Sequence, residues 1–587
     1  MSKKRKVLLI AGLSLLALIL IGTAYLYFNF NKVVESIVRK ELIAKNNENP
    51  NSIYHLEIER VKFNFVAGSI SIKGIRVTPR DSILAFRTVL KILPTTVFEI
   101  EIPELKLDGI SYNELLNKQA ELKAIRFIKP KIKVFVFDDT LKQNLSKDTA
   151  SFQSALLEVL QNADAGLVSV ENASAEIIRV SQSDSNELFS INPYSVVLTN
   201  VHMDESTLNS AQYVEYENLA ISGENVVVRQ KQKTQLNMGK LQYSNEDTSL
   251  YIDYFKFSPL QSKKKFSGKR RWRKAWVSFS ADRIELKSIN PTLLTEYQLV
   301  DIQELNIENG QIDAYVDTRI PKNPDKEILM LGEMVGKIPT PVHIHSLKWN
   351  SGKIHFETTN KENGNTGGLS FEEFSAEGTN ISNIPERLKE DSYAILNART
   401  LFMGGAALNV HFEFDQLSES GDFTFRANAS NLSMKLLNPL LKPVAGVEIN
   451  SGTITQLSLR SNANRYHADG NVVLKYEDLK MSILEMDDKT NALKKRGLIS
   501  FIANEIIPSQ NKTDSKSYSE GIIDLDREPL DSFFKYIWLM LADGAEDIIL
   551  GNKKKYEKRN RNKNTDKEQE KRKKKKKKKN KKKRKNK

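Results

Sequence analysis

The chain has 587 residues, of which 40% are hydrophobic and 27% charged, so collagen-like and wholly disordered classes are excluded. It contains no cysteine, which excludes disulfides, thiol nucleophiles and thiolate metal sites. The positive charge behind its net charge of +15 is concentrated at the two ends. Residues 552–587 hold 23 basic and four acidic residues, a net charge of +19, and residues 3–6, KKRK, add +4. The remaining residues therefore carry a net charge of −8. The mildly acidic central part of the chain is therefore unsuited to forming a groove that binds a phosphate backbone, so nucleic acid is not an expected partner.

The first element is an apolar run at residues 7–28, VLLIAGLSLLALILIGTAYLYF, preceded by a basic segment at 1–6. As a helix the run spans about 33 Å, close to one hydrocarbon core, and predicts a transmembrane anchor with its N-terminus in the cytoplasm. Two points stay open. Gly22 and Ala24 fit the small −3 and −1 positions of a signal-peptide cleavage site, and basic residues at 32–45 nearly balance those before the run.

The region that follows, residues 29–527, shows the alternation typical of β-strands. Residues 55–65 and 69–77 alternate apolar and polar side chains, with a change of phase at Gly74 that indicates a bulge. One short pattern recurs at 104–112, 167–178, 219–228, 305–316 and 347–356. It consists of two apolar residues at alternate positions, then a Gly or Asn, then two more apolar residues. Placing a turn at each Gly or Asn predicts a series of hairpins, and their uneven spacing argues against a repeat of fixed period.

The predicted hairpins have one apolar face. With Asn309-Gly310 as a turn, Ile307 faces Ile312, and with Ser351-Gly352 as a turn, Trp349 faces Ile354. The apolar face must be hidden by closing, by a second layer, or by curling into a trough for apolar ligands, and the sequence leaves these alternatives open. The residues expected to line such a trough are Ile70, Ile72, Leu305, Ile307, Leu347, Trp349, Ile354 and Phe356.

These patterns together predict a mainly β fold. A single N-terminal transmembrane helix is followed by a long, twisted antiparallel β-sheet that forms an elongated groove, with few short helices and a disordered C-terminal tail.

Catalytic and metal motifs are weak throughout the sequence. His343 and His345 share one face of their predicted strand while His355 points to the other, so a zinc site built from all three is not expected. The motifs G-x-S-x-G and H-E-x-x-H are missing from the sequence. We therefore expect no enzyme activity, no cofactor and no metal.

A basic segment at residues 263–274, KKKFSGKRRWRK, interleaves positive charge with tryptophan. This composition suits an anionic membrane surface or a phosphate backbone, although a solvated loop between strands is the simpler interpretation. The residues predicted for membrane or phosphate contact here are Lys263, Lys264, Arg270, Arg271, Trp272 and Arg273.

The end of the chain predicts an amphipathic helix at 528–550, which includes Phe533, Phe534 and Trp538. Its uninterrupted apolar run is too short to span a bilayer, so the helix either lies in a membrane interface or caps the sheet. The polybasic tail at 552–587 repels itself and is expected to be disordered. It suits an anionic lipid surface, and as a bare charge run it also suits RNA.

The order of these parts resembles the AsmA-like family of bacterial envelope proteins, which includes TamB and YdbH-type members. The resemblance lies in residues 54–77, in 124–139 with a strand-Pro-strand turn at Pro130, in 337–357, and in 431–484. It implies an anchor in the bacterial inner membrane, a periplasmic β-trough, and phospholipid transport toward the outer membrane. The lysine tail departs from the family pattern.

The predicted function is therefore binding or conducting of phospholipid acyl chains by an inner-membrane-anchored periplasmic protein. Two alternatives stay open: a scaffolding protein for outer-membrane assembly with a closed core, and a membrane-tethered RNA binder that uses its tail.

Overall fold

In the computed structural model the chain is mainly β with few short helices, as predicted. Its residues form two compact units, Met1–Leu260 with Ser280–Asp301 and Gln261–Phe279 with Ile302–Lys587. The structure describes residues 43–48, 52–64, 67–80, 96–109, 119–137, 162–180, 185–203, 215–230, 233–268, 270–486, 493–495, 507–514 and 518–550.

The predicted anchor at 7–28 and the tail at 552–587 lie outside these residues. Within the described ranges, none of the helices has the length and apolar character needed to cross a bilayer.

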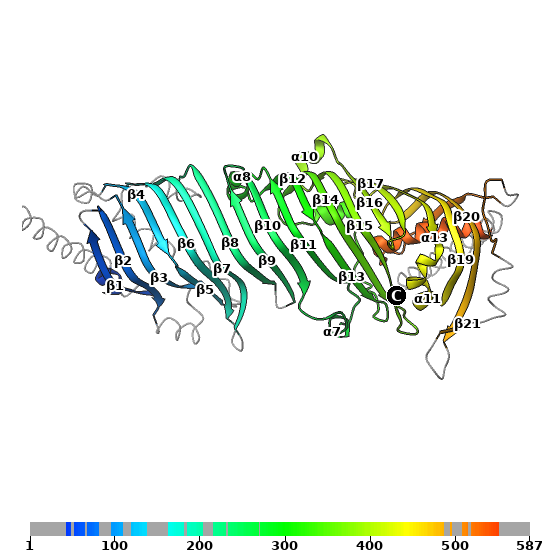
Figure 1. Ribbon diagram of the computed structural model, residues 1–587, viewed down its shortest axis with the longest axis horizontal. Helices are drawn as coiled ribbons and strands as arrows, with labels where there is room; N and C mark the ends of the chain where they lie inside the picture. Colours follow the sequence, from blue (N-terminus) through cyan, green and yellow to red (C-terminus); the bar gives the residue numbers. More distant parts are fainter. Residues whose placement is uncertain are drawn as a thin grey trace, which may run out of the picture. The chain divides into compact units, whose positions relative to one another are not determined.

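The first unit is a meander in which strands that follow one another along the chain lie side by side (Figure 1). Its strands are β1 (Tyr54–Asn64), β2 (Ser69–Pro79), β3 (Thr96–Asp108), β4 (Gln119–Ile128), β5 (Lys131–Phe137), β6 (Asn162–Val180), β7 (Ser185–Met203), β8 (Asn218–Gln230), β9 (Thr234–Ser244), β10 (Ser249–Pro259) and, from Ser280 on, β11 (Trp276–Lys287). Its described helices are the short α2 (Lys45–Glu48) and α8 (Pro291–Glu296).

The second unit is also built on strands that pair with their neighbours in sequence. Its strands are β12 (Val300–Glu308, from Ile302), β13 (Gln311–Asp317), β14 (Val342–Thr359), β15 (Thr366–Ser382), β16 (Tyr393–Phe402), β17 (Ala406–Asp415), β18 (Phe423–Ser433), β19 (Val447–Ala463), β20 (His467–Met486), β21 (Leu493–Lys495) and β22 (Gly521–Asp526). Its helices are α7 (Lys263–Gly268), α9 (Leu331–Gly336), α10 (Pro385–Glu390), the 3-10 turn η2 (Met434–Leu437), α11 (Asn438–Ala445) and α13 (Phe533–Leu550).

Several predicted turns are points of left-handed backbone inside continuous strands, and the pairing register shifts at those in β6 and β14. Asn172, Asn225 and Ser351 have φ angles of 51°, 50° and 55°, and they lie within β6, β8 and β14, which run through them. The predicted turns within 167–178, 219–228 and 347–356 are therefore wrong. A bulge residue and a tight hairpin turn both use left-handed backbone, so Asn and Gly suit either one.

One further predicted turn, at Pro130, joins strands that lie in one line. β3 pairs with β4 and β5 in a single antiparallel register, since Glu104 lies opposite Ile128 and Glu101 opposite Lys131. The strand-Pro-strand turn at Pro130 is therefore wrong.

Parallel pairing is the second departure from the predicted antiparallel sheet. β4 and β5 both pair in parallel with β6, and β13 pairs in parallel with β14, so that Ile312 lies beside Ile354. The hairpin pairs predicted across Asn309-Gly310 and Ser351-Gly352 do not form. A parallel neighbour requires the chain to cross back, which residues 318–341 do before β14.

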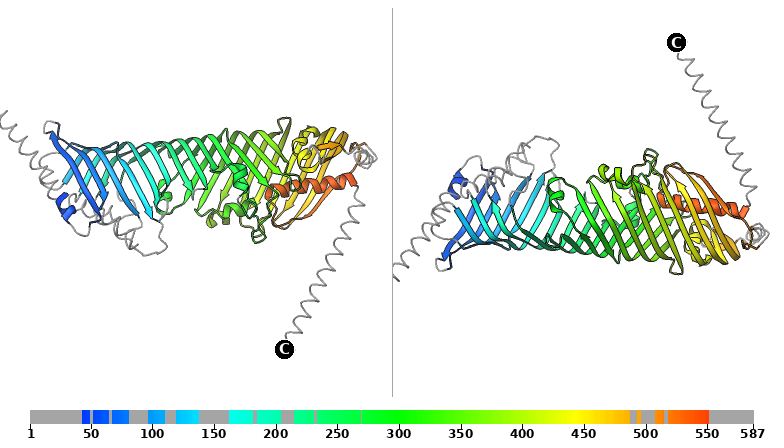
Figure 2. Two further views of the ribbon diagram at one scale, coloured as in Figure 1. Left: turned by 90° about the horizontal axis from the view of Figure 1, so that it is seen from below. Right: turned by 90° about the horizontal axis from the view of Figure 1, so that it is seen from above.

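Helix α13 covers the apolar face of the last strands of the second unit. It packs on β20 and β22, and Figure 2 shows it, in red, running across those strands. Phe533, Tyr536 and Met540 are at most 3% exposed and belong to one core with Val472 and Ile523. Of the range 528–550 predicted as an amphipathic helix, residues Phe533–Leu550 form α13, and one face of α13 caps the sheet.

The helix begins after Ser532, whose hydroxyl accepts a hydrogen bond from the Lys535 backbone N–H at 3.3 Å. Its close approach to β22 depends on glycine. A Cβ atom on Gly521 would lie 2.0 Å from the Gly544 carbonyl oxygen, and a Cβ atom on Gly544 would lie 2.4 Å from Val472 Cγ2.

The edge strand β1 is blocked at one point by a side chain. The Asn47 amide donates to the Leu56 carbonyl at 2.9 Å and accepts from the Leu56 N–H at 3.0 Å. It thus occupies the backbone groups that another strand would use at an open edge.

The glycine contact gives a test of how α13 is held. We expect Gly521→Ala to lower the free energy of unfolding of the second unit by about 1–3 kcal/mol, because the methyl group meets backbone that cannot move independently. Gly336→Ala is the matched control, since a Cβ atom there meets nothing within 4 Å. Chemical denaturation of the full chain measures both. Equal stability of the two variants would show that the helix adjusts freely.

Candidate functional site

The candidate site is the apolar face of the sheet in the first unit. Cross-strand partners share a face of a sheet, so the pairing registers trace rows of apolar side chains across it. One row runs from β1 to β10 through Val61, Ile72, Leu105, Phe127, Val170, Val196, Ile221, Tyr243 and Leu250. Eight strand spacings of about 4.8 Å make this row roughly 38 Å long, which exceeds the roughly 30 Å hydrocarbon core of a bilayer.

A second row lies on the other side of the bulges. It passes through Phe98, Val134, Ile177, Phe189, Val228, Leu236 and Phe257. Each bulge adds one residue, which shifts the alternation by one position and returns apolar residues to the same face. The bulge at Asn172 does this within β6, between Val170 and Ile177.

The side chains of these rows are mostly half-buried. Ile72, Phe127 and Ile221 fall between the buried and exposed classes. By contrast, Val472 and Ile523 under α13 are at most 1% exposed. Within the described part of the first unit, α2 is the helix that packs on the sheet, against β1. Among the described residues, the rows of the first unit are therefore less covered than the core under α13.

The predicted lining residues lie on apolar faces in both units. Ile70 and Ile307 are buried, at 6% and 8% exposure. The other predicted lining residues are half-buried: Ile72, Leu305, Leu347, Trp349, Ile354 and Phe356.

Trp349 lies directly against two glycines, Gly310 between β12 and β13 and Gly352 within β14. A Cβ atom on Gly310 would approach its indole to 2.6 Å, and one on Gly352 to 2.3 Å. The ring also packs edge-on against Phe279 and Phe374, with centroids at 5.7 and 5.0 Å. This contact explains why glycine stands at both positions.

A surface hollow of about 520 Å³ lies over β13, β14 and β15. Its charged lining groups are paired: Asp313 with His355 at 3.2 Å, Glu372 with Lys353 at 3.4 Å, and Glu357 with Lys263. This hollow therefore offers a polar surface with paired side chains in place of an apolar wall for acyl chains.

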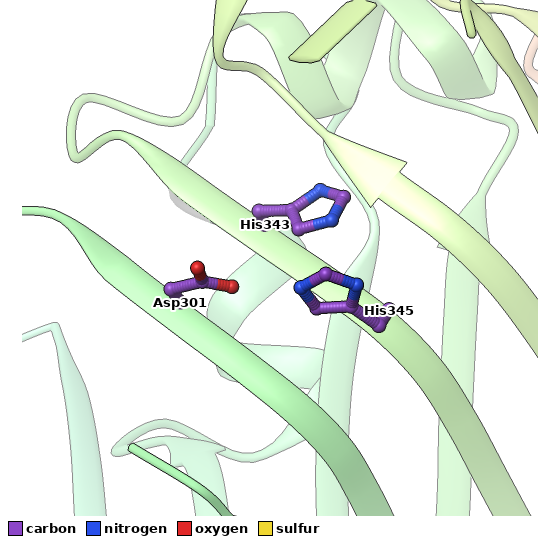
Figure 3. Close-up of side chains that lie close together, drawn as sticks. All are labelled: Asp301, His343 and His345. Atoms are coloured by element: carbon purple, nitrogen blue, oxygen red, sulfur yellow. The ribbon is translucent and has the colours of Figure 1, made fainter. Parts of the chain in front are cut away.

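His343 and His345 lie together and His355 lies apart from them, as the sequence predicts, but a bulge within β14 separates them and not a hairpin turn. His343 and His345 lie side by side on β14, with ring centroids 4.0 Å apart (Figure 3). Asp301, drawn in the same view, is the residue at which the first unit ends. His355 lies ten residues further along β14, about 33 Å at 3.3 Å per residue, beyond the bulge. The three histidines therefore cannot share one ion.

The basic segment 263–274 is more ordered than a solvated loop. It contains α7, and Arg273 donates to the Ile320 carbonyl at 2.8 Å while Arg270 covers the Phe266 ring at 3.9 Å. Lys263 pairs with Glu357 and lies 5.5 Å from the Trp276 ring.

The remaining predicted contact residues of this segment differ in exposure. Lys264 and Arg271 are exposed, whereas Trp272 is half-buried and lies 4.9 Å from the Arg271 guanidinium. Of the six residues predicted to contact a membrane, Lys263, Arg270 and Arg273 thus make contacts within the second unit.

The three aromatic residues predicted for membrane contact on α13 separate into two groups. Phe533 is 3% exposed and packs against Phe412 and Phe423, with centroids at 5.6 and 5.4 Å. Phe534 is 72% exposed and Trp538 is 36% exposed. Phe533 therefore belongs to the core, and only Phe534 and Trp538 can meet a surface.

A buried polar cluster at the start of α13 escaped the sequence analysis. Asp531, 2% exposed, pairs with Lys322 and, at 2.8 Å, with Lys535. Arg527, 5% exposed, donates to the carbonyls of Ile328 and Arg465 at 2.8 and 3.0 Å. Lys322 is 209 positions from Asp531 in the sequence, so no local pattern could have indicated this pairing.

Comparison with known proteins adds no family to these observations. No protein-family model matches the chain, and no curated protein matches it.

The Asp531 cluster predicts acid-sensitive docking of α13. Burial alone would raise the pKa of Asp531, but the hydrogen bonds from Lys322 and Lys535 outweigh it and hold the pKa below the ordinary carboxyl value. A lowered folded-state pKa stabilises the fold above the unfolded value of about 3.9, and this contribution is lost as the pH falls through the folded pKa.

We expect Asp531→Asn to cost about 1–3 kcal/mol at neutral pH, because two lysines lose their buried partner, and to weaken the dependence of stability on acid pH. Denaturation of the full chain between about pH 7 and pH 3 measures both effects. Asp325→Asn, at an exposed position, is the control. If the stability of Asp531→Asn fell with acid pH as steeply as that of the unchanged chain, Asp531 would not be the group responsible.

Proposed function

We propose that the chain is a bacterial inner-membrane-anchored envelope protein that binds or conducts phospholipid acyl chains along the apolar face of its first unit. Most of the chain would lie in the periplasm, and the lipid would move toward the outer membrane. The row of mostly half-buried apolar side chains from Val61 to Leu250 is the observation that carries this proposal. The AsmA-like resemblance supports the same function.

The physical argument concerns the cost of moving lipid through water. Exposing an acyl chain costs about 0.8 kcal/mol per CH₂ group, so a surface that covers even part of the chain lowers the barrier to transfer greatly. Half-buried side chains suit this role because they retain area to exchange with a ligand. The activity is binding, and it needs no bond to be made or broken.

Scaffolding remains a second candidate because of the second unit. There α13 packs on the apolar face of the last strands, and its residues Phe533, Tyr536 and Met540 are at most 3% exposed in the core. A closed core suits a protein that presents its outer surface to partners. The two candidates differ on whether lipid contacts the first unit.

Adjacent residues of β8 allow a direct test of lipid contact. Ile221 belongs to the apolar row, whereas Ala220 is exposed and points to the opposite face of the same strand. A photo-crosslinking amino acid replaces one or the other in the full chain in living bacteria grown with radiolabelled phosphate. We expect phospholipid adducts at position 221 and few at position 220. Equal labelling at both positions, or none at either, would contradict the proposal.

A charge on the same face should reduce lipid binding. We expect Ile221→Glu to lower the phospholipid that co-purifies with the full chain several-fold, because a carboxylate disfavours contact with an acyl chain. Ala220→Glu adds the same charge to the opposite face and should leave bound lipid unchanged. Native mass spectrometry measures the lipid, and circular dichroism checks that both variants are folded. The scaffolding alternative predicts no difference between them.

A further inference from the structure

Two histidine side chains of β14 converge on one another. His343 and His345 stand two positions apart, so they share one face of the strand, and their Cα atoms are about 6.6 Å apart. Their ring centroids are only 4.0 Å apart, with the ring planes at 78° to each other (Figure 3). A nitrogen atom of each ring lies within 4.8 Å of a nitrogen atom of the other. The two side chains therefore lean toward each other.

This separation suits a single metal ion. A zinc ion binds a histidine nitrogen at about 2.0–2.1 Å, so two nitrogens on one tetrahedral ion lie about 3.3 Å apart. Small rotations of the two side chains bring nitrogens that lie within 4.8 Å of each other to this separation. Because both residues belong to one strand, the backbone between them does not need to move.

The surroundings limit the motion of the pair. His343 is 5% exposed, and His345 is half-buried. Opposite His343 on β15 lies Ser382, which is also buried and donates its backbone N–H to the side-chain oxygen of Gln416 at 2.8 Å. Packed neighbours restrict the rotamers of a side chain and so hold it near the geometry that an ion requires. The partial exposure of His345 leaves room for water beside it.

The chemistry of the two side chains indicates the kind of ion. Neutral imidazole is a ligand for Zn²⁺, Cu²⁺ and Ni²⁺, whereas Mg²⁺ and Ca²⁺ prefer oxygen ligands. The chain contains no cysteine, so thiolate cannot contribute. Two protein nitrogens leave the remaining coordination positions for water or another oxygen ligand.

We propose that His343 and His345 together bind one divalent transition-metal ion through one ring nitrogen each. The site lies in the second unit, and it does not rest on the acyl-chain path of the first unit. It also differs from a site built from three histidines, which the position of His355 excludes. A bound ion holds the two side chains in their folded arrangement and so adds to the stability of the second unit.

The first test is calorimetric titration of the full chain, freed of metal with EDTA, with ZnCl2 in excess Mg²⁺. We expect His345→Asn to bind one Zn²⁺ fewer than the unchanged chain, or to bind it at least about ten-fold more weakly, because one of two imidazole ligands is lost. His411→Asn is the matched control. His411 is a half-buried histidine on β17 of the same unit, and its Nδ1 lies 2.8 Å from the Asn397 side-chain oxygen. This control should bind Zn²⁺ as the unchanged chain does.

A second measurement identifies the ligands directly. Electron paramagnetic resonance of the full chain with one equivalent of Cu²⁺ should show coupling to two imidazole nitrogens, and to fewer in His345→Asn. ZnCl2 should raise the midpoint of thermal unfolding of the unchanged chain and of His411→Asn, and raise it less for His345→Asn. Circular dichroism without metal checks that the variants are folded. His343 is buried, so replacing it can disturb the fold, and His345→Asn is therefore the deciding variant.

Three results would overturn the proposal. Unchanged Zn²⁺ binding by His345→Asn would show that the pair does not hold the ion, and an equal loss in His411→Asn would show that histidines contribute without regard to position. Displacement of Zn²⁺ by Mg²⁺ would point to oxygen ligands in place of imidazole. The crosslinks at position 221 report on the first unit alone, so this metal site and the proposed function can fail independently.

Discussion

The need to keep apolar side chains on one face of long strands governs most of this structure. Side chains alternate with a period of two, so a strand has one apolar face only while its sequence stays in phase. β6, β8 and β14 each change phase in the middle, and each has a residue in the left-handed region at that point. Because the extra residue restores the phase, the apolar rows continue across the sheet on both sides of the bulges.

The two units treat the resulting apolar face differently. In the second unit, α13 packs against it, and Val472 and Ile523, which lie beside Gly544 of the helix, are almost completely buried. In the first unit, the rows through Ile72 and Ile221 stay half-buried. The same strand pattern thus gives a buried core where a helix follows in the sequence and supplies a second layer. Where the described residues supply no such layer, the apolar side chains stay half-buried.

Polar groups of the described residues serve mainly to hold this arrangement. Asn47 occupies the outer backbone groups of β1, and Asp543 and Asp547 do the same for β22. Asp531 and Arg527 attach the start of α13 to residues that are distant in sequence. Strand edges and buried charges both require such partners, because unpaired backbone groups invite further pairing and unpaired buried charges are costly.

The sequence by itself determined the strand character of the body and the helix near 528–550, because period-two and period-3.6 patterns are local properties. It also separated His355 from His343 and His345, although a bulge, not a hairpin turn, sets them apart. It could not distinguish a bulge from a turn at Asn309-Gly310, since both need the same backbone conformation, and so it missed the parallel pairing of β13 with β14. Only the tertiary structure decided which apolar residues are covered, because that depends on where α13 packs: Phe533 became core and Phe534 surface. Burial is a property of contacts between distant segments, and no pattern within one segment contains it.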